Sequence, residues 1–226
     1  MNGTSFQCSM DSQGYKVKPS SEIGLINNRI GGLAKSVSQD NLKQFVTMVG
    51  NDGYAFSPAT FQNGKRDKAN FVQQQLFALD FDGGVSFEQV KDRSERYNLP
   101  MLFAYDTLSS ENSNKFRVVY LNDASIPNKK TAEAMLKSLS IIFPETDKSC
   151  INDVSRIYYG GKELIYYDES APEVNVESLF RNMSLCLKNR YGNTNYKRKL
   201  KEFSKSTGIQ ALCFLDGFAL RRVRPT

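Results

Sequence analysis

The chain has 226 residues, of which 40% are hydrophobic and 24% are charged, and its formal net charge is +6. This composition is sufficient for a globular core and excludes a chain that is disordered throughout. No run approaches the roughly 18 apolar residues of a membrane span, and the polar N-terminus lacks the apolar stretch of a secretory signal. We therefore expect a cytoplasmic protein without a membrane partner.

In chain order, the first segment is polar. Residues 1–35 are rich in Ser, Gly and Asn, which predicts an irregular lead-in. Apolar residues recur with helical spacing over 42–49, and Gly50 predicts the end of that helix. A short strand is expected at 54–56, and the polar stretch 61–70 predicts a mobile loop.

A predicted strand follows in the middle of the chain. Residues 74–84, QQLFALDFDGG, form an apolar run that ends in a Gly-Gly turn. Ser86 begins a capping-box pattern, which predicts a helix to about Tyr97. Two β-rich runs, 101–107 and 115–121, are separated by a polar loop, which is typical of a hairpin.

The last third of the chain changes from mixed to helical. Thr131 is predicted to cap a helix that Pro144 ends. Residues 156–167 read as strand, Gly-Gly turn and strand, and from residue 176 the pattern is helical and basic. The sequence therefore predicts an α+β fold, with a mixed or antiparallel sheet flanked by helices over 36–175 and a basic helical extension over 176–226.

The positive charge lies mostly in this extension. Residues 181–226 hold 11 Lys and Arg against two acids, a net charge of +9, whereas the preceding 180 residues have a net charge of −3. Such a segment can bind a phosphate backbone, although a solvated helix face has the same composition. The candidate nucleic-acid contacts there are Lys197, Arg198, Lys199 and Lys201, and the polar loop adds Lys65 and Arg66.

Two residue counts limit the chemistry. Histidine is absent, which excludes Ser-His-Asp triads, HExxH metalloproteases and two-histidine metal sites. Catalysis therefore has to use carboxylates, hydroxyls, Lys, Arg or a bound metal. The four cysteines, Cys8, Cys150, Cys186 and Cys213, lie far apart without a CxxC pair, so we predict buried, reduced thiols and no zinc site.

Asp80 and Asp82 are the sharpest chemical signal. Side chains alternate along a strand, so both carboxylates are expected on one face at the end of an apolar run. Their mutual repulsion would be relieved by Mg²⁺ or Mn²⁺, which prefer oxygen ligands. A polar strand end and a glycosyltransferase-like DxD site remain alternative interpretations of this pattern.

Further charged residues follow in two segments. Lys115 and Arg117 are expected on one face of the next strand, where they could bind phosphate or form a cross-strand ion pair. Asp147 and Asp153 offer a further carboxylate, and Arg156 lies just before the second Gly-Gly turn.

The order of these motifs resembles the archaeo-eukaryotic primase superfamily, and most of all the primase-polymerase domains of phages, plasmids and other bacterial mobile elements. The motifs are LDFDGG, then KFRVVY after a segment with Thr and Ser, then D-x5-D-x2-R-x-Y-Y-G-G, within residues 50–170. The resemblance implies a primase-polymerase catalytic domain over 36–175, acting in the bacterial cytosol. Asp80 and Asp82 match the first motif, and Asp147, with Asp153 as the competing candidate, matches the third.

The resemblance also implies the chemistry. Three Asp side chains would hold two Mg²⁺ or Mn²⁺ ions for transfer of a nucleotide from a (d)NTP to a 3′-hydroxyl. The family's second motif is usually Ser-x-His, but this chain has Ser109 and Lys115 in that region, so Arg117, with Arg156, becomes the candidate triphosphate contact. The expected partners are a single-stranded DNA template, a primer and a helicase. A catalytically inert DNA-binding replication module and a metal-dependent nuclease are the alternatives.

Overall fold

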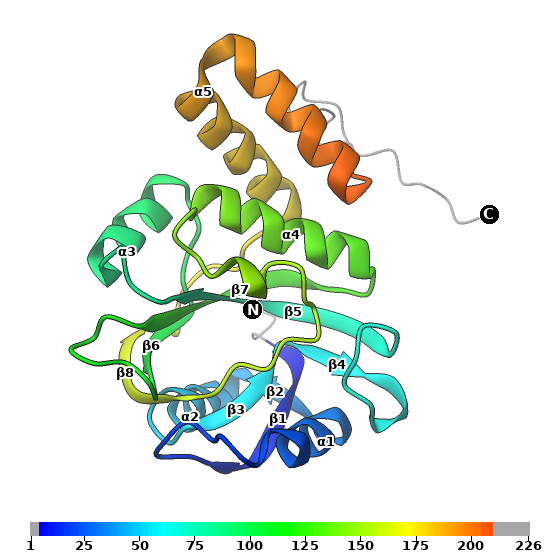
Figure 1. Cartoon of the computed structure of the whole chain (residues 1–226), viewed down its shortest axis with the longest axis vertical. Coiled ribbons are helices and arrows are strands. Elements are labelled where there is room, and N and C mark those ends of the chain that lie inside the picture. Colours follow the sequence, from blue (N-terminus) through cyan, green and yellow to red (C-terminus); the bar gives the residue numbers. More distant parts are fainter. Residues whose placement is uncertain (1–4, 210–226) are drawn as a thin grey trace.

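The computed structural model describes residues 5–209 of the chain. Helices and strands alternate irregularly along it (Figure 1). The strands are β1 (Ser5–Gly14), β2 (Ala34–Ser38), β3 (Tyr54–Ser57), β4 (Ala59–Phe61), β5 (Phe71–Phe81), β6 (Phe103–Thr107), β7 (Phe116–Ile126) and β8 (Gly161–Tyr167). The helices are α1 (Ile23–Gly32), α2 (Gln39–Gly50), α3 (Phe87–Arg96), α4 (Lys129–Ile142) and α5 (Val176–Thr207).

The strands form two antiparallel sheets. The larger sheet has the order β4-β5-β7-β6-β8, and the smaller has the order β2-β1-β3. The larger sheet is covered on one face by α3 and α4, and on the other by α2 and the smaller sheet (Figure 1). The predicted α+β fold with antiparallel sheets and flanking helices is therefore confirmed.

Strict alternation along β5 divides the core in two. Phe77, Leu79 and Phe81 pack toward α3 and α4, whereas Leu76 and Ala78 pack toward α2 and the smaller sheet. Asp80 follows Leu76 and Ala78 at intervals of two residues, so its side chain points to the same face as theirs. The Asp80 side chain therefore lies on the face of the larger sheet that packs against α2 and the smaller sheet.

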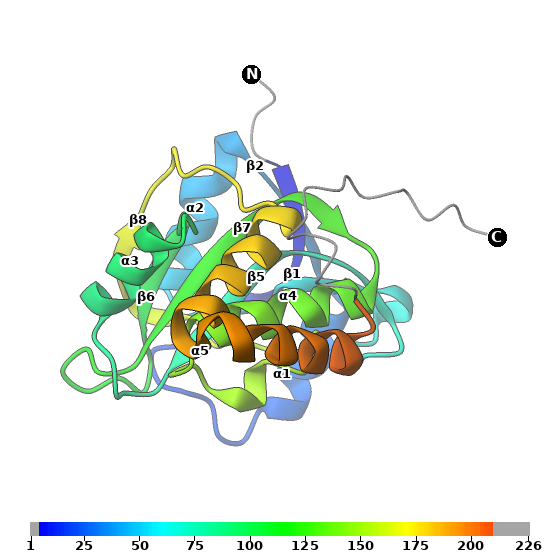
Figure 2. The same ribbon diagram turned by 90° about the horizontal axis from the view of Figure 1, so that it is seen from above.

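The long helix α5 is part of the core. Asn175 caps its first turn, and a positive φ of 71° at Gly192 divides it into two halves that fold back on each other (Figures 1 and 2). Phe180 in the first half contacts Phe203 in the second, with ring centroids 6.0 Å apart. Leu179 and Met183 are fully buried in the cluster that includes α4, so the first half closes the core.

Most elements predicted from periodicity are confirmed. They include the helix before Gly50, which is α2, the strand through Asp80, which is β5, and the hairpin of β6 and β7. The capping box at Ser86 is present, with its hydroxyl accepting a hydrogen bond from the Gln89 N–H. None of the described helices is long and apolar enough to cross a membrane.

The prediction of an irregular lead-in over 1–35 is wrong. This segment contains β1 and α1, and β1 is the central strand of the smaller sheet. Phe6, Cys8 and Met10 alternate into the core, while the residues between and after them are polar. The polar composition hid this alternation in the sequence.

Two local predictions also need correction. The helix α4 is capped by Asn128, whose side chain accepts from the Thr131 N–H, because the chain already turns helical at Lys129. The stretch 156–160 forms a single bridge from Tyr158 to Phe56 and not a strand. The polar segment 61–70 is mostly a loop, as expected, and it holds a short 3-10 turn and an Asp67 side chain that accepts several local hydrogen bonds.

Candidate metal and nucleotide site

Asp80 lies one residue before the end of β5, in a row of polar side chains that crosses three strands. It is directly opposite Arg117 on β7, which in turn is opposite Tyr105 on β6. All three side chains are buried. The register of the sheet, and not any local turn, therefore brings this row together.

The carboxylate of Asp80 is only half satisfied. Arg117 Nη2 donates to Asp80 Oδ2 at 2.7 Å. The other oxygen, Oδ1, is buried and has no hydrogen-bond partner among residues 5–209. A buried carboxylate oxygen without a donor is costly, so this atom is suited to a cation or another ligand.

Arg117 is held by the protein on several sides. Its Nη1 donates to Tyr105 Oη at 3.0 Å and to the Tyr159 carbonyl at 2.5 Å, and the guanidinium lies 4.8 Å from the centre of the Tyr158 ring. Burial alone would lower the pKa of Arg117, but the adjacent Asp80 raises it above its ordinary value. Both Nη atoms already bind protein groups, which favours a role in orienting Asp80 over binding of a phosphate.

Asp147 lies beside Asp80 because their backbones are linked. The Asp147 N–H donates to the Asp80 carbonyl at 2.9 Å. Asp147 caps a 3-10 turn (Lys148–Cys150), and its carboxylate accepts from Ser149 N and Oγ. Burial raises the pKa of Asp147, but the Ser149 hydrogen bonds outweigh it and hold the pKa below its ordinary value. The side chain is therefore a carboxylate at neutral pH.

Cys150 completes a group of three ligand atoms. Its Sγ lies 3.5 Å from Asp147 Oδ2, and one ligand atom each from Asp80, Asp147 and Cys150 lie within 4.8 Å of one another. Burial raises the pKa of the Cys150 thiol to about 11, so without a cation it stays protonated at neutral pH. The two carboxylates, which include the orphaned Oδ1 of Asp80, could hold a divalent cation.

A polar pocket of about 180 Å³ opens in front of this group. Its lining residues are Lys18, Asp80, Asp82, Thr107, Leu108, Ser109, Arg117, Asp147, Arg156 and Tyr159, and we call it the Asp80 pocket. Arg156 Nη2 lies 3.7 Å from Asp147 Oδ2, and Lys18 is exposed at the rim, with its ammonium 6.0 Å from the Tyr159 ring centre. The pocket thus combines acidic ligands with two cations that remain accessible to an anion.

The pocket gathers most of the residues predicted from the motifs. Asp80, Asp147, Arg117, Arg156 and Ser109 all line it. Of the two candidates for the later acidic residue, Asp147 is the one beside Asp80.

The remaining motif residues differ in position. Asp82 lies beyond the end of β5, is exposed, and lines the pocket without belonging to the three-residue group. Asp153 is outside the lining and accepts hydrogen bonds from Ser155. Lys115, directly before β7, is also outside the lining; its carbonyl accepts from the Thr107 N–H and its N–H donates to Ser110 Oγ.

The predicted basic contacts lie away from the Asp80 pocket. Arg66 donates to the Ser155 carbonyl and to Asn27, so it fastens the loop before β5, while Lys65 is exposed. Lys197 and Lys201 are exposed on the second half of α5. Arg198 and Lys199 on the same half both form ion pairs with Glu202.

Sequence reasoning missed Lys18 and Cys150 as site residues. Lys18 belongs to a segment predicted to be irregular, and nothing local links it to β5. Cys150 was predicted to be a buried thiol, which it is, but its position three residues after Asp147 in a tight turn was a usable signal. Cys213 lies outside the described residues.

We compared the chain with known protein families, curated proteins and solved structures, and report a similarity to one solved structure. The sequence matches no protein-family model and no curated protein. Among solved structures, the chain is similar to the AEP domain of the cyanophage S-2L primase-polymerase, PrimPol. That likeness covers 80% of this chain and 89% of the other, with 10% sequence identity and a TM-score of 0.46.

Proposed function

We propose that this chain is a metal-dependent nucleotidyltransferase of the primase-polymerase type. It would transfer a nucleotide from a (d)NTP to the 3′-hydroxyl of a primer on a single-stranded DNA template. A helicase that exposes this template would be a further partner. The order in which the motifs with Asp80, Arg117 and Asp147 follow one another in the sequence supports this proposal.

The observation that carries the proposal is the orphaned Oδ1 of Asp80 next to a second carboxylate. Two carboxylates within 4.8 Å of each other repel, and a buried oxygen without a donor adds to this cost. Arg117 and Ser149 donate to three of the four carboxylate oxygens, and among the described residues Asp80 Oδ1 is the one left without a donor. A buried anionic oxygen without a donor, next to a second carboxylate, supports cation binding at this site.

The roles of the other residues follow from their exposure. Arg156 and Lys18 are accessible and would hold the triphosphate, and Ser109 at the mouth would donate a further hydrogen bond. Arg117 would orient Asp80. A bound divalent cation would activate the attacking hydroxyl and offset the charge of the leaving pyrophosphate, and Asp82 would take part in holding a second ion.

An inert DNA-binding module is the second candidate. The specific observation in its favour is the buried ion pair of Asp80 with Arg117, at 2.7 Å, because a paired carboxylate can also be purely structural.

Primer extension with matched variants tests the proposal. Asp80→Asn and Asp147→Asn should each abolish incorporation, since both remove a charged ligand while keeping the side-chain shape. Asp153→Asn is the control, because it changes the same charge in the same loop but lies outside the pocket lining. Incorporation by Asp80→Asn at the wild-type rate would refute the catalytic reading.

Metal binding gives a second readout that does not depend on activity. We expect Mn²⁺ to raise the melting temperature of the wild-type chain, because ligands that bind only the folded state stabilise it by about 2.7 kcal/mol at 100 times their Kd. Asp147→Asn should remove this shift and Asp153→Asn should keep it. Mn²⁺-dependent loss of the DNA substrate without added dNTP would instead indicate a nuclease.

A further inference from the structure

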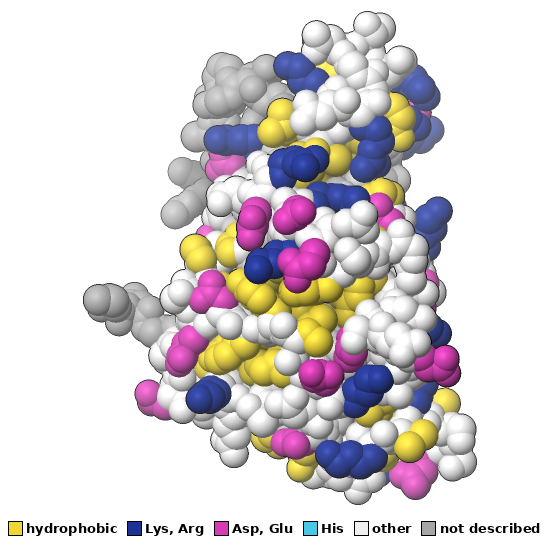
Figure 3. All heavy atoms as spheres, turned by 90° about the vertical axis from the view of Figure 1, so that its left-hand side faces the viewer, with side chains coloured by type: hydrophobic (Ala, Val, Ile, Leu, Met, Phe, Trp, Pro, Cys, Tyr) yellow, Lys and Arg dark blue, Asp and Glu magenta, His cyan; other side chains and the backbone are white. Residues whose placement is uncertain are grey.

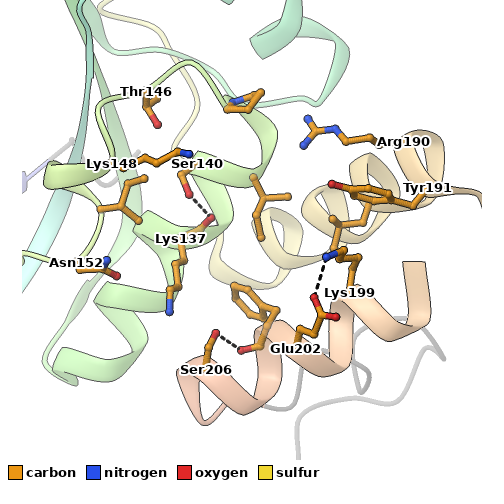
Figure 4. A pocket seen from close by; sticks show the side chains of 15 residues that line it. Lys137, Ser140, Thr146, Lys148, Asn152, Arg190, Tyr191, Lys199, Glu202 and Ser206 are labelled. Carbon is orange, nitrogen blue, oxygen red and sulfur yellow. Dashed lines mark hydrogen bonds and ion pairs between the residues drawn. The ribbon is translucent and has the colours of Figure 1, made fainter. Parts of the chain in front are cut away.

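A second and larger hollow lies between α4 and the two halves of α5. It has a volume of about 550 Å³ and is bounded on its third side by the segment 146–152. Figure 4 shows Lys137 of α4 on one side and Arg190, Tyr191 and Lys199 of α5 on the other. We call it the α4–α5 groove. It is separate from the Asp80 pocket, with which it shares no lining residue.

The groove is lined by an excess of positive charge. Lys137, Lys148, Arg190 and Lys199 contribute cations, and among the described lining residues Glu202 is the one acid. Lys148 and Arg190 are exposed, and Lys137 is half-buried. On the face drawn in Figure 3, Lys and Arg side chains also gather over the upper part of the molecule, where α5 lies. A ligand with several negative charges fits this lining.

The groove also offers surfaces for flat apolar groups. Ile141, Leu187 and Phe203 form part of its lining. The Tyr191 ring is 40% exposed, and the Lys199 ammonium lies 5.6 Å from its centre. An exposed tyrosine flanked by cations can stack against a base while the cations bind the adjoining phosphates.

The groove continues beyond a single ligand-sized hollow. A neighbouring hollow of about 310 Å³ shares Lys137, Asn152 and Ser206 with it and adds Lys130, Lys205 and Glu133. Cations therefore follow one another from Arg190 at one end to Lys130 and Lys205 at the other. An elongated polyanion matches this arrangement better than a compact one.

We propose that the α4–α5 groove binds single-stranded nucleic acid. A duplex would keep its bases paired and away from Tyr191 and the apolar lining, whereas a single strand presents both its phosphates and the faces of its bases. The segment 146–152, which bounds one side of the groove, also carries Asp147 of the Asp80 pocket and the neighbouring Cys150. The binding itself does not depend on catalysis in that pocket.

Fluorescence anisotropy with a labelled oligodeoxythymidylate of about 20 nucleotides, measured in EDTA on the full chain, tests this proposal. The variant Lys137→Ala/Arg190→Ala removes two cations of the groove. Each phosphate contact to a single strand contributes about 0.7 to the slope of log K against log salt, so we expect this slope to fall by about 1.4. The affinity at about 0.1 M salt should fall about 25-fold.

The matched control is Arg181→Ala/Lys188→Ala, which removes two exposed cations from the same helix but outside the groove lining. It should change the affinity by less than about 3-fold, as expected for screened charges away from the contact. Equal losses in the two double variants would overturn the proposal, since the binding would then follow net charge alone. Melting temperatures should show that both variants remain folded.

Variants at Tyr191 separate the contribution of base stacking to the affinity from that of charge. Tyr191→Ala should weaken binding about 5- to 150-fold without changing the salt slope, and Tyr191→Phe should restore it, because the stacking energy belongs to the ring. Unchanged affinity in Tyr191→Ala would remove the stacking contact and overturn the single-strand assignment. Binding of dTTP as tight as that of the oligonucleotide would overturn it as well, in favour of a mononucleotide site.

Discussion

The Asp80 pocket and the α4–α5 groove use charged residues in opposite ways. In the pocket, Asp80 and Arg117 are buried, with side chains 11% and 8% exposed, and they bind each other directly. In the groove, Lys199 and Glu202 form an ion pair whose side chains are 31% and 49% exposed. The pocket is small and polar, and the groove is about three times larger and partly apolar.

This difference separates charges that hold a side chain in one position from charges that attract a ligand. A buried pair is strong because water cannot compete, and it fixes the geometry of both partners. Exposed cations are screened by salt and their side chains are mobile. Their contribution to binding a polyanion therefore depends on how many there are and not on a fixed arrangement. Chemistry that needs a fixed carboxylate is therefore expected at Asp80, and tracking of a flexible polyanion at α5. Four changes probe this contrast, from the largest expected effect to the smallest.

Truncation after residue 175 is expected to have the largest effect. It removes the groove, but it also removes Leu179, Phe180 and Met183 from the core. Each such side chain contributes about 1.5–3 kcal/mol when buried, against a total stability of about 5–15 kcal/mol for a domain. We expect the truncated chain to lose its cooperative thermal transition, measured by circular dichroism. A chain that ends at residue 209 is the control, and a sharp transition in the shorter chain would show that α5 is a separate unit.

Replacing Arg117 with Met tests the buried pair. It leaves the Asp80 carboxylate buried without its partner, which should lower the free energy of unfolding by about 3–5 kcal/mol. Urea denaturation measures this change. Asp80→Asn/Arg117→Met should be more stable than Arg117→Met alone, because the unpaired charge is then gone. Equal stability of these two variants would mean that the pair does not couple the strands β5 and β7.

The half-buried pair of Arg93 and Glu145 should have an intermediate effect. Two hydrogen bonds of 2.6 and 3.0 Å join them, and although burial raises the pKa of Glu145, Arg93 lowers it below its ordinary value. The pair therefore stabilises the fold above the unfolded-state pKa of about 4.3, and this contribution disappears as the pH falls through the lower folded-state pKa. Glu145→Gln should cost roughly 0.5–1.5 kcal/mol at pH 7, and the cost should vanish at low pH.

The smallest effect on stability is expected for Glu202→Gln. The Lys199 hydrogen bond, with Arg198, holds the pKa of Glu202 below its ordinary value, so the side chain is charged at neutral pH. Because the pair is exposed, the melting temperature should not change measurably. Affinity for the oligodeoxythymidylate should rise by up to about 5-fold, since a negative charge leaves the groove. A large loss of stability would contradict the distinction between the two regions.

The fold was predictable where hydrophobic periodicity is strong. The strand through Asp80, the helix before Gly50 and the capping box at Ser86 all follow from local sequence. The strand β1 was missed because its alternating Phe6 and Met10 stand among Ser, Gln and Asp, a composition typical of loops. An alternating apolar pattern therefore predicts a strand only when the residues between the apolar ones are not also typical of turns and loops.

The candidate site was predictable in its acidic residues and less so in its partners. Asp80 could be singled out because a carboxylate in an apolar strand is costly. The pairing of Arg117 with Asp80, and the approach of Lys18 from the β1–α1 connection, depend on strand register and on tertiary packing. No spacing along the chain contains this information.

The hydrogen bond from the Asp147 N–H to the Asp80 carbonyl has a consequence for mutational tolerance. It is formed entirely by backbone atoms, at 2.9 Å, so every residue type except proline at position 147 can form it. Replacing the side chain at position 147 with any other than that of proline therefore leaves this backbone link in place. Ligand identity at this site can be exchanged, between carboxylate, amide and thiol, without moving the scaffold that spaces the ligands.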